Sequence, residues 1–107
     1  MNSIEISSGN VYDDLGHPDA AEMQIKARLA GRIAQIIKSA RMTQASASEI
    51  LGMPQPKLSG MLRGQFRGIS ETKMLDCLNR LGQDVEIVIR ESSSAPRNGR
   101  TSVLFAE

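Results

Sequence analysis

Residues 43–63 read TQASASEILGMPQPKLSGMLR, and this stretch decides the fold of the 107-residue chain. It opens on Thr43, a residue type that commonly caps a helix. Gly52 lies near its middle, and glycine readily takes the left-handed conformation that ends many helices. The stretch therefore predicts one helix that ends at Gly52, a tight turn, and a second helix over about Gln55–Leu62. The proline in the second helix falls in its first turn, where proline is tolerated.

The packing positions make this pattern more specific than two short helices joined by a glycine. The two helices of a helix-turn-helix cross steeply and pack tightly. Such packing requires a small residue in the first helix and apolar anchors on both sides of the turn. Six residues fill these positions: Ala47, Leu51, Gly52, Met53, Leu58 and Met61. Because the second helix of such a unit lies in the major groove of DNA, the stretch predicts a DNA-binding motif.

Two further helices are predicted on either side of the motif. Apolar residues recur at three- and four-residue steps over about Ala20–Ala40, which predicts an amphipathic helix. Asp19 stands where it can cap that helix, and Glu22 is placed to reach back to the cap amide. The later helix is predicted to start at Ser70 and to end at Gly82. Its buried face is formed by Met74, Cys77, Leu78 and Leu81.

The apolar pattern changes period at residues 85–89, which read VEIVI. Alternation of this kind, rich in β-branched residues, is typical of a β-strand. A lone strand needs a partner, and three remain open: a second copy of itself, the segment near Val11, or Val103–Phe105. The stretch from Ser92 to Arg100 has the composition of a linker. We therefore divide the chain into an irregular N-terminal arm (1–17), a helix-turn-helix domain with its C-terminal strand (18–90), and a flexible tail (91–107).

Charge is distributed unevenly along the chain, although the formal net charge is only +1. Residues 1–22 carry five acidic residues and no Lys or Arg. Residues 23–73 carry nine basic residues against two acidic ones, a net charge of +7. A basic middle segment suits a polyanion. A solvated helical surface can have the same composition, so charge alone does not decide the function.

Other residue types argue against secretion and catalysis. Cys77 is the one cysteine, so no disulfide can form within the chain, which fits a reducing cytoplasm. The N-terminus does not read as a signal peptide, and no apolar run is long enough to cross a membrane. His17 is the one histidine, and no cluster at metal-ligand or catalytic-triad spacing accompanies it. We expect no enzymatic activity, no metal and no cofactor.

Several motifs resemble those of the Xre/Cro-type helix-turn-helix family. They are Met42-Thr43-Gln44, Ala47, Leu51-Gly52-Met53, Leu58-Ser59, Arg63-Gly64 and Leu81-Gly82. The wider frame is similar to the HigA-type antitoxin branch, at Val11–Gly16, Pro54–Lys57, Leu62–Gly68 and Leu81–Ile87. The resemblance covers about residues 11–90. It implies a mostly α, four- to five-helix, lambda-repressor-like domain with one C-terminal β-strand. It also implies a cytoplasmic, nucleoid-associated repressor that is the antitoxin of a toxin-antitoxin pair and regulates its own operon.

Four candidate DNA contacts are predicted to bind phosphates. Thr43 and Gln44 stand at the start of the first helix of the motif, where free amides can face a phosphate. Capping is the favoured role of Thr43. Arg63 and Arg67 follow the second helix, in a segment expected to lie along the DNA backbone. Contacts of this kind give affinity and register rather than sequence choice.

The remaining candidate contacts are predicted to face the bases. Gln55, Lys57 and Ser59 lie in the first turns of the second helix, the part that reaches base edges. Gln suits adenine and Lys suits guanine. Pro56 offers an apolar surface to a thymine methyl group, and Gly60 leaves room for close approach. Plain solvent exposure is the alternative interpretation for Gln55 and Lys57.

The expected partners are double-stranded DNA and a second copy of the chain. DNA sites of this class are read by two-fold dimers, with half-sites about one helical turn, roughly 34 Å, apart. The resemblance further implies a small basic toxin protein, commonly an RNase. The acidic residues of the N-terminal region suit such a partner: Asp13, Asp14, Asp19 and Glu22. Two alternatives stay open, a stand-alone transcriptional regulator without a toxin and a module that chiefly binds a toxin.

Overall fold

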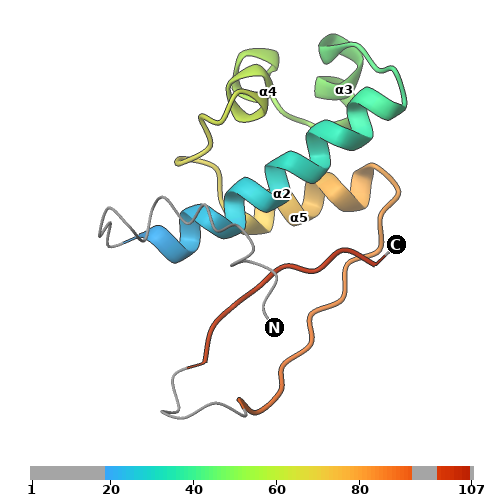
Figure 1. The fold of residues 1–107 in the computed structure, drawn as a ribbon. Coiled ribbons are helices and arrows are strands. Elements are labelled where there is room, and N and C mark those ends of the chain that lie inside the picture. Colours follow the sequence, from blue (N-terminus) through green and yellow to red (C-terminus); the bar gives the residue numbers. More distant parts are fainter. Residues whose placement is uncertain (1–18, 93–98, 107) are drawn as a thin grey trace.

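The computed structural model describes residues 19–92 and 99–106 of the protein. The described residues form four α-helices, and they are arranged as Figure 1 shows. These are α2 (Ala20–Ser39), α3 (Gln44–Leu51), α4 (Gln55–Leu62) and α5 (Glu71–Arg80). The predicted N-terminal arm (1–17), with its docking candidates near Val11 and its histidine His17, lies outside the described residues.

Helix α2 forms where the sequence predicts it, but its N-terminus is held differently. Asp19 is the N-cap residue, yet its side chain accepts no hydrogen bond from the helix amides. It pairs with Arg67 instead, and Glu22 pairs with Lys26. The predicted capping box is therefore wrong, because each carboxylate has a cation as its partner. The apolar face is confirmed at Leu29, Ile33 and Ile37, which are buried, whereas Ala40 lies beyond the helix end and is exposed.

The two helices of the motif begin and end as predicted. The Thr43 side chain accepts a hydrogen bond from the amide of Ser46 at 3.0 Å, which satisfies one free donor of α3. Gly52 follows α3 with φ +62° and ψ 41°, the left-handed conformation that a side chain disfavours. Helix α4 starts after Pro54 without a side-chain cap and carries Pro56 in its first turn, where the amides have no helical acceptor.

Helix α5 confirms the last predicted helix. The Ser70 side chain accepts a hydrogen bond from the amide of Lys73 at 3.0 Å, so Ser70 is the cap. The helix ends at Arg80, and Gly82 follows with φ +86°. Met74, Cys77 and Leu78 are buried as predicted, and Leu81 is half-buried.

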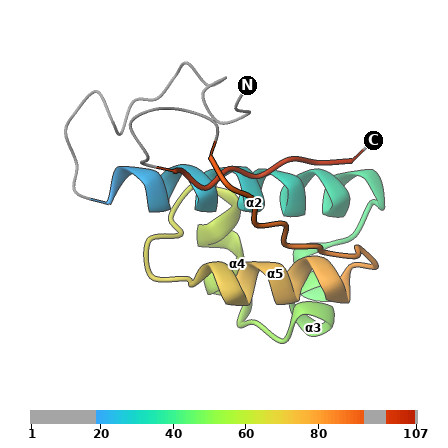
Figure 2. The same ribbon diagram turned by 90° about the horizontal axis from the view of Figure 1, so that it is seen from below.

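The core lies where all four helices meet. Helices α2 and α5 run side by side, and α3 and α4 close the core from one side (Figures 1 and 2). The largest fully buried side chains of the described residues lie at its centre: Ile33, Leu51, Leu58, Met61, Met74 and Cys77. Burial of one large apolar side chain contributes about 1.5–3 kcal/mol. The helix-turn-helix anchors Leu51, Leu58 and Met61 are therefore also core residues of the whole domain.

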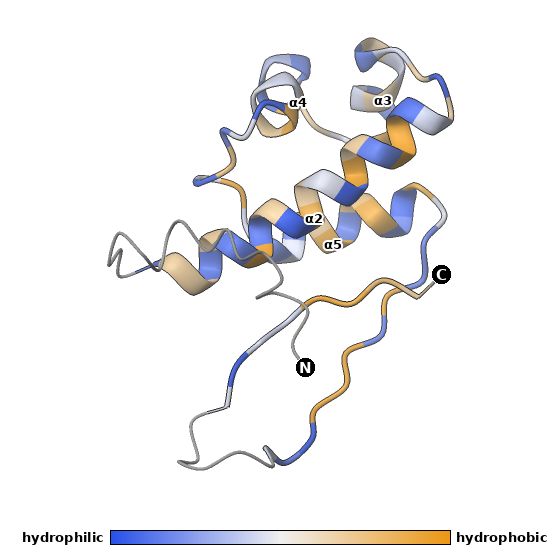
Figure 3. Cartoon of the chain, in the orientation of Figure 1, coloured by the Kyte–Doolittle hydropathy of each residue, from blue (hydrophilic) through white to orange (hydrophobic). Residues whose placement is uncertain are grey.

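The predicted C-terminal strand does not form within the described part of the chain. Residues 83–92 run as an extended segment whose side chains Ile87, Val88 and Ile89 are 76%, 74% and 91% exposed. Figure 3 shows hydrophobic residues along this segment. Val103 and Phe105 contact Arg28 and Arg32 of α2 instead, and the N-terminal segment lies outside the described residues. A strand is stable only when its amides and carbonyls are paired. Pairing of residues 85–89 with the same segment of a second copy stays a prediction.

Candidate nucleic-acid interface

The start of α3 presents the first predicted contacts. Thr43 and Gln44 are both exposed there, beside the free amides of the first helical turn. The Thr43 oxygen accepts from Ser46, which agrees with the capping role favoured for it. The dipole and free amides of a helix N-terminus attract a phosphate, and Gln44 is the exposed side chain that accompanies them.

The start of α4 brings three more predicted contacts together. Gln55, Pro56 and Lys57 are all exposed on its first turn. Ser59 is half-buried one turn further along, and its hydroxyl oxygen accepts a hydrogen bond from Nη1 of Arg63 at 2.6 Å. The sequence predicts a base contact at Ser59 and a separate phosphate contact at Arg63, but the structure links the two side chains by a hydrogen bond.

The space beside Gly60 is taken up by the protein itself. A Cβ atom at this glycine would come within 3.3 Å of Oε1 of Gln65. Gln65 also accepts from Nη2 of Arg63 at 3.3 Å. The room attributed to Gly60 for close approach to DNA is therefore used for packing the chain after α4.

Arg67 lies in the loop between α4 and α5, and α2 holds it twice. Its guanidinium forms an ion pair with Asp19 while the side chain remains 60% exposed. Its carbonyl oxygen accepts a hydrogen bond from Nζ of Lys26 at 2.8 Å. Lys26 is only 3% exposed, and its Nζ also lies 3.0 Å from a carboxylate oxygen of Glu22.

Lys26 is the residue that sequence reasoning missed. It is one of the basic residues of the middle segment, yet it is buried and bonded within the protein. A long side chain can bury its aliphatic part when its charged end is paired. The spacing of Glu22 and Lys26, four residues apart on one helix, was the signal available in the sequence.

Comparison with known proteins agrees with the helix-turn-helix that the structure shows. A family model described as a helix-turn-helix domain matches residues 11–90. The chain belongs to this helix-turn-helix family. A solved structure assigned to the XRE family of transcriptional regulators is 43% identical, with a TM-score of 0.77. The match covers 83% of this chain and 100% of that chain. A search of curated proteins finds no match.

The helix-turn-helix is fixed to the domain by cations of α5. Nζ of Lys73 donates to the carbonyl of Leu51 at 2.9 Å, and Nη1 of Arg80 donates to the carbonyl of Ile50 at 3.2 Å. These are terminal carbonyls of α3, which lack helical donors and carry the negative end of its dipole. Asp76 lies between the two cations, 3.4 Å from Nζ of Lys73 and 2.9 Å from Nε of Arg80.

The carboxyl group of Asp76 responds to these neighbours. Burial raises its pKa, but the hydrogen bonds and positive charges of Arg80 and Lys73 outweigh this effect, so the pKa lies below its usual value. Asp76 therefore stays ionised under ordinary conditions and keeps both cations directed at the end of α3.

Two more arginines of the basic segment face away from the helix-turn-helix. The C-terminal segment runs along α2 on the side away from α3 and α4 (Figures 1 and 2). Nη2 of Arg28 donates to the carbonyl of Val103 at 3.0 Å. The guanidinium groups of Arg28 and Arg32 lie 4.9 and 4.7 Å from the ring centre of Phe105, within cation–π range. These two charges hold the tail and do not contribute to the helix-turn-helix surface.

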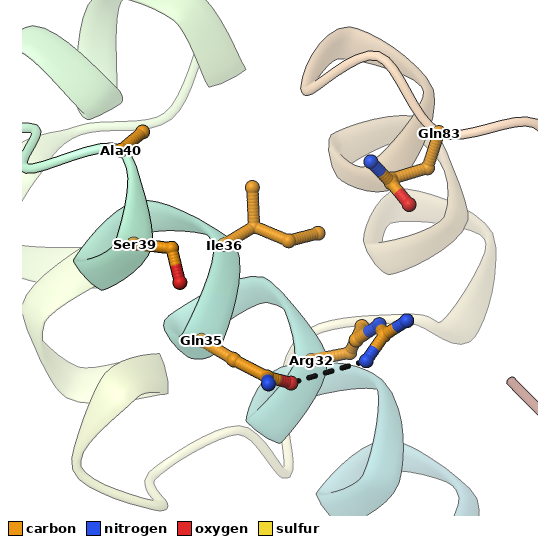
Figure 4. A pocket seen from close by; sticks show the side chains of 6 residues that line it. All are labelled: Arg32, Gln35, Ile36, Ser39, Ala40 and Gln83. Carbon is orange, nitrogen blue, oxygen red and sulfur yellow. Dashed lines mark hydrogen bonds between the residues drawn. The ribbon is translucent and has the colours of Figure 1, made fainter. Parts of the chain in front are cut away.

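An open pocket of about 520 Å³ lies beside this contact, between the second half of α2 and the end of α5 (Figure 4). Its lining includes Arg32, Gln35, Ile36 and Gln83, and Nη1 of Arg32 donates to Oε1 of Gln35 at 3.1 Å. The pocket belongs to neither helix of the helix-turn-helix.

The described residues lack the features of a metal site and of a membrane span. Among them, no group of three or more His, Cys, Asp or Glu side chains is arranged to hold a metal ion. Within the same residues, no helix has the length and apolar character that crossing a membrane requires. The features that the structure does bring together are the exposed N-terminal turns of α3 and α4 and the anchored loop that follows α4.

Proposed function

We propose that this protein is a sequence-specific DNA-binding transcriptional repressor. One observation carries the proposal: the N-terminal turns of α3 and α4 expose polar side chains on a helix-turn-helix whose apolar anchors are buried. The similarity to a protein assigned to a family of transcriptional regulators supports it. A protein of this kind is a regulator rather than an enzyme.

The proposed contacts divide into two groups. Gln55, Lys57 and the ring of Pro56 face base edges from the first turn of α4, where side chains of a recognition helix select sequence. Ser59 stands on the same helix and is steadied by Arg63. The second group consists of the residues that bind phosphates in this proposal: Thr43, Gln44, Arg63 and Arg67.

The test compares substitutions from the two groups. Lys57→Ala is expected to change the preferred sequence selected from a random pool of duplexes, by about 1–3 kcal/mol of discrimination at one base pair. Arg67→Ala is expected to weaken binding to all duplexes. It is also expected to reduce the slope of log K against log salt by about one, the loss of one phosphate contact. Arg100→Ala, in the exposed C-terminal segment, removes one positive charge as the matched control. An unchanged salt slope for Arg67→Ala would show that Arg67 does not contact a phosphate.

We further infer that two copies bind DNA together and that the segment 85–89 contributes to the dimer. The exposed side chains Ile87, Val88 and Ile89 support this inference, because contiguous exposed apolar surface marks interaction sites. Antiparallel pairing with the same segment of a second copy would satisfy the backbone groups and bring these side chains against their cross-strand counterparts. A chain truncated after Gly82 is expected to sediment as a monomer, whereas a stable dimer of the truncated chain would contradict this role.

The resemblance to the HigA-type branch supports a second role, as the antitoxin of a toxin-antitoxin pair. Asp19 and Glu22 lie at the start of α2 with side chains that are 30% and 49% exposed, next to the acidic N-terminal region. A basic partner protein suits this charge. The test is a pull-down with the product of any adjacent reading frame that encodes a small basic protein. Absence of binding would favour a stand-alone regulator.

A further inference from the structure

The start of α2 and the loop after α4 meet at one residue. Arg67 is held at both ends, because Asp19 pairs with its guanidinium and Lys26 donates to its carbonyl oxygen. The ion pair with Asp19 and the hydrogen bond from Lys26 differ in exposure. Lys26 is buried, whereas the Arg67 side chain is 60% exposed and the Asp19 side chain is 30% exposed.

The chemistry of the exposed hold is that of a phosphate contact. A guanidinium group donates N–H hydrogen bonds to carboxylate and phosphate oxygens alike, and here Nη1 of Arg67 donates to Oδ2 of Asp19. A donor group directed at a carboxylate is unavailable to a phosphate oxygen in the same geometry. We propose that Asp19 is a built-in competitor of DNA for Arg67, so that a phosphate must displace this carboxylate when the loop meets the DNA backbone. The proposal rests on the phosphate-binding role given to Arg67 above.

The buried hold confines this exchange to one side chain. The hydrogen bond from Lys26 fixes the backbone of Arg67, and the neighbouring side chains Phe66 and Ile69 are buried in the core. The guanidinium can therefore change partners while the loop stays in place. The exchange then costs one exposed ion pair, and such pairs typically alter an equilibrium by less than about fivefold.

The experiment measures DNA affinity for Asp19→Asn, for Arg67→Ala and for the double variant. The probe is a 24-base-pair duplex of random sequence, with fluorescence anisotropy recorded at several KCl concentrations. Asp19→Asn is expected to bind the duplex about two- to fivefold more tightly than the natural protein and with a steeper salt dependence. The gain is expected to vanish when Arg67 is replaced by Ala. Asparagine also favours the helix N-cap position, and thermal unfolding checks that each variant is folded.

Glu49→Gln is the matched control, because Glu49 is exposed on α3 and takes no part in the contacts of Arg67. It removes one negative charge and is expected to increase affinity less than Asp19→Asn does. An equal gain in Glu49→Gln, or a gain of Asp19→Asn that persists without Arg67, would overturn the competition in favour of a general charge effect. Weakened binding by Arg67→Ala together with unchanged binding by Asp19→Asn would refute the competition alone. An Arg67→Ala variant with natural affinity would refute the phosphate role as well.

Discussion

Two glycine-to-alanine substitutions are expected to change stability in opposite directions. Gly52 closes α3 with φ +62°, and a residue with a Cβ atom loses about 1–2 kcal/mol in this left-handed conformation. The new Cβ would also lie 3.3 Å from Nη1 of Arg80, the group that donates to the carbonyl of Ile50. Displacement of this exposed side chain adds up to about 1 kcal/mol. Gly52→Ala should therefore lower the free energy of unfolding by about 1–3 kcal/mol.

Gly31 is the matched control within the same protein. It lies inside α2, and a Cβ atom added there would meet no heavy atom within 4 Å. Alanine is favoured over glycine in a helix interior by about 0.5–1 kcal/mol. Gly31→Ala should therefore raise the free energy of unfolding by about that amount.

The assay is urea denaturation at roughly 25 °C, with the loss of helix followed by far-ultraviolet circular dichroism. A change of 1 kcal/mol corresponds to a shift of about 4–8 °C in Tm for a domain of this size, which gives a second readout. Gly52→Asn should recover part of the loss, since asparagine tolerates the left-handed region. A midpoint for Gly52→Ala at or above that of the natural protein, with an unchanged m-value, would refute the reasoning.

Three further substitutions or measurements test the remaining local arguments. Thr43→Ala removes the acceptor for the amide of Ser46 and should cost about 1 kcal/mol in urea denaturation; an unchanged midpoint would contradict the cap. Burial raises the pKa of Asp76, but its bonds to Arg80 outweigh this effect and lower the pKa overall. The carboxylate therefore stabilises the fold fully above its ordinary pKa of 3.8. This contribution is lost as the pH falls through the lowered pKa. Asp76→Asn should therefore flatten the acid side of the stability profile, and parallel profiles would argue against it. Burial raises the pKa of the Cys77 thiol, so the folded protein should react with a thiol reagent at pH 8 far more slowly than the urea-unfolded chain, and equal rates would show that the thiol is accessible.

The helix boundaries could be predicted because their causes are local. Thr43 and Ser70 accept hydrogen bonds from amides three residues ahead, and Gly52 and Gly82 take positive φ values where chain direction changes. Each of these effects depends on a residue and its near neighbours in sequence. The same reasoning located the exposed first turn of α4, and with it the candidate base contacts.

The misjudged residues depend on partners far away in sequence. Lys26 is buried because it reaches the carbonyl of Arg67, which lies 41 residues later. Asp19 left its capping role for the guanidinium of Arg67, 48 residues away. No periodic pattern reports such distances. The segment 85–89 shows the opposite limit, since its alternation describes a strand without naming the partner that would complete it.

The basic middle segment illustrates how far net charge can mislead about an interface. Lys26 and Lys73 bind backbone carbonyls inside the domain. Arg28 and Arg32 face the tail on the far side of α2. The charges that remain near the proposed DNA-binding surface are fewer than the sequence total suggests, so individual substitutions there should have measurable effects.

The hydrogen bonds from α5 to the end of α3 bear on how such a protein can change its target during evolution. Lys73 and Arg80 secure the helix-turn-helix from behind, through main-chain carbonyls that no mutation of α3 or α4 side chains removes. Gln55 and Lys57, by contrast, are exposed and take no part in the contacts that hold these helices. If these residues read DNA as proposed, they can therefore be replaced or redesigned without loss of the scaffold. A related chain could acquire a new operator through two substitutions on the first turn of α4 while its folding remained unchanged.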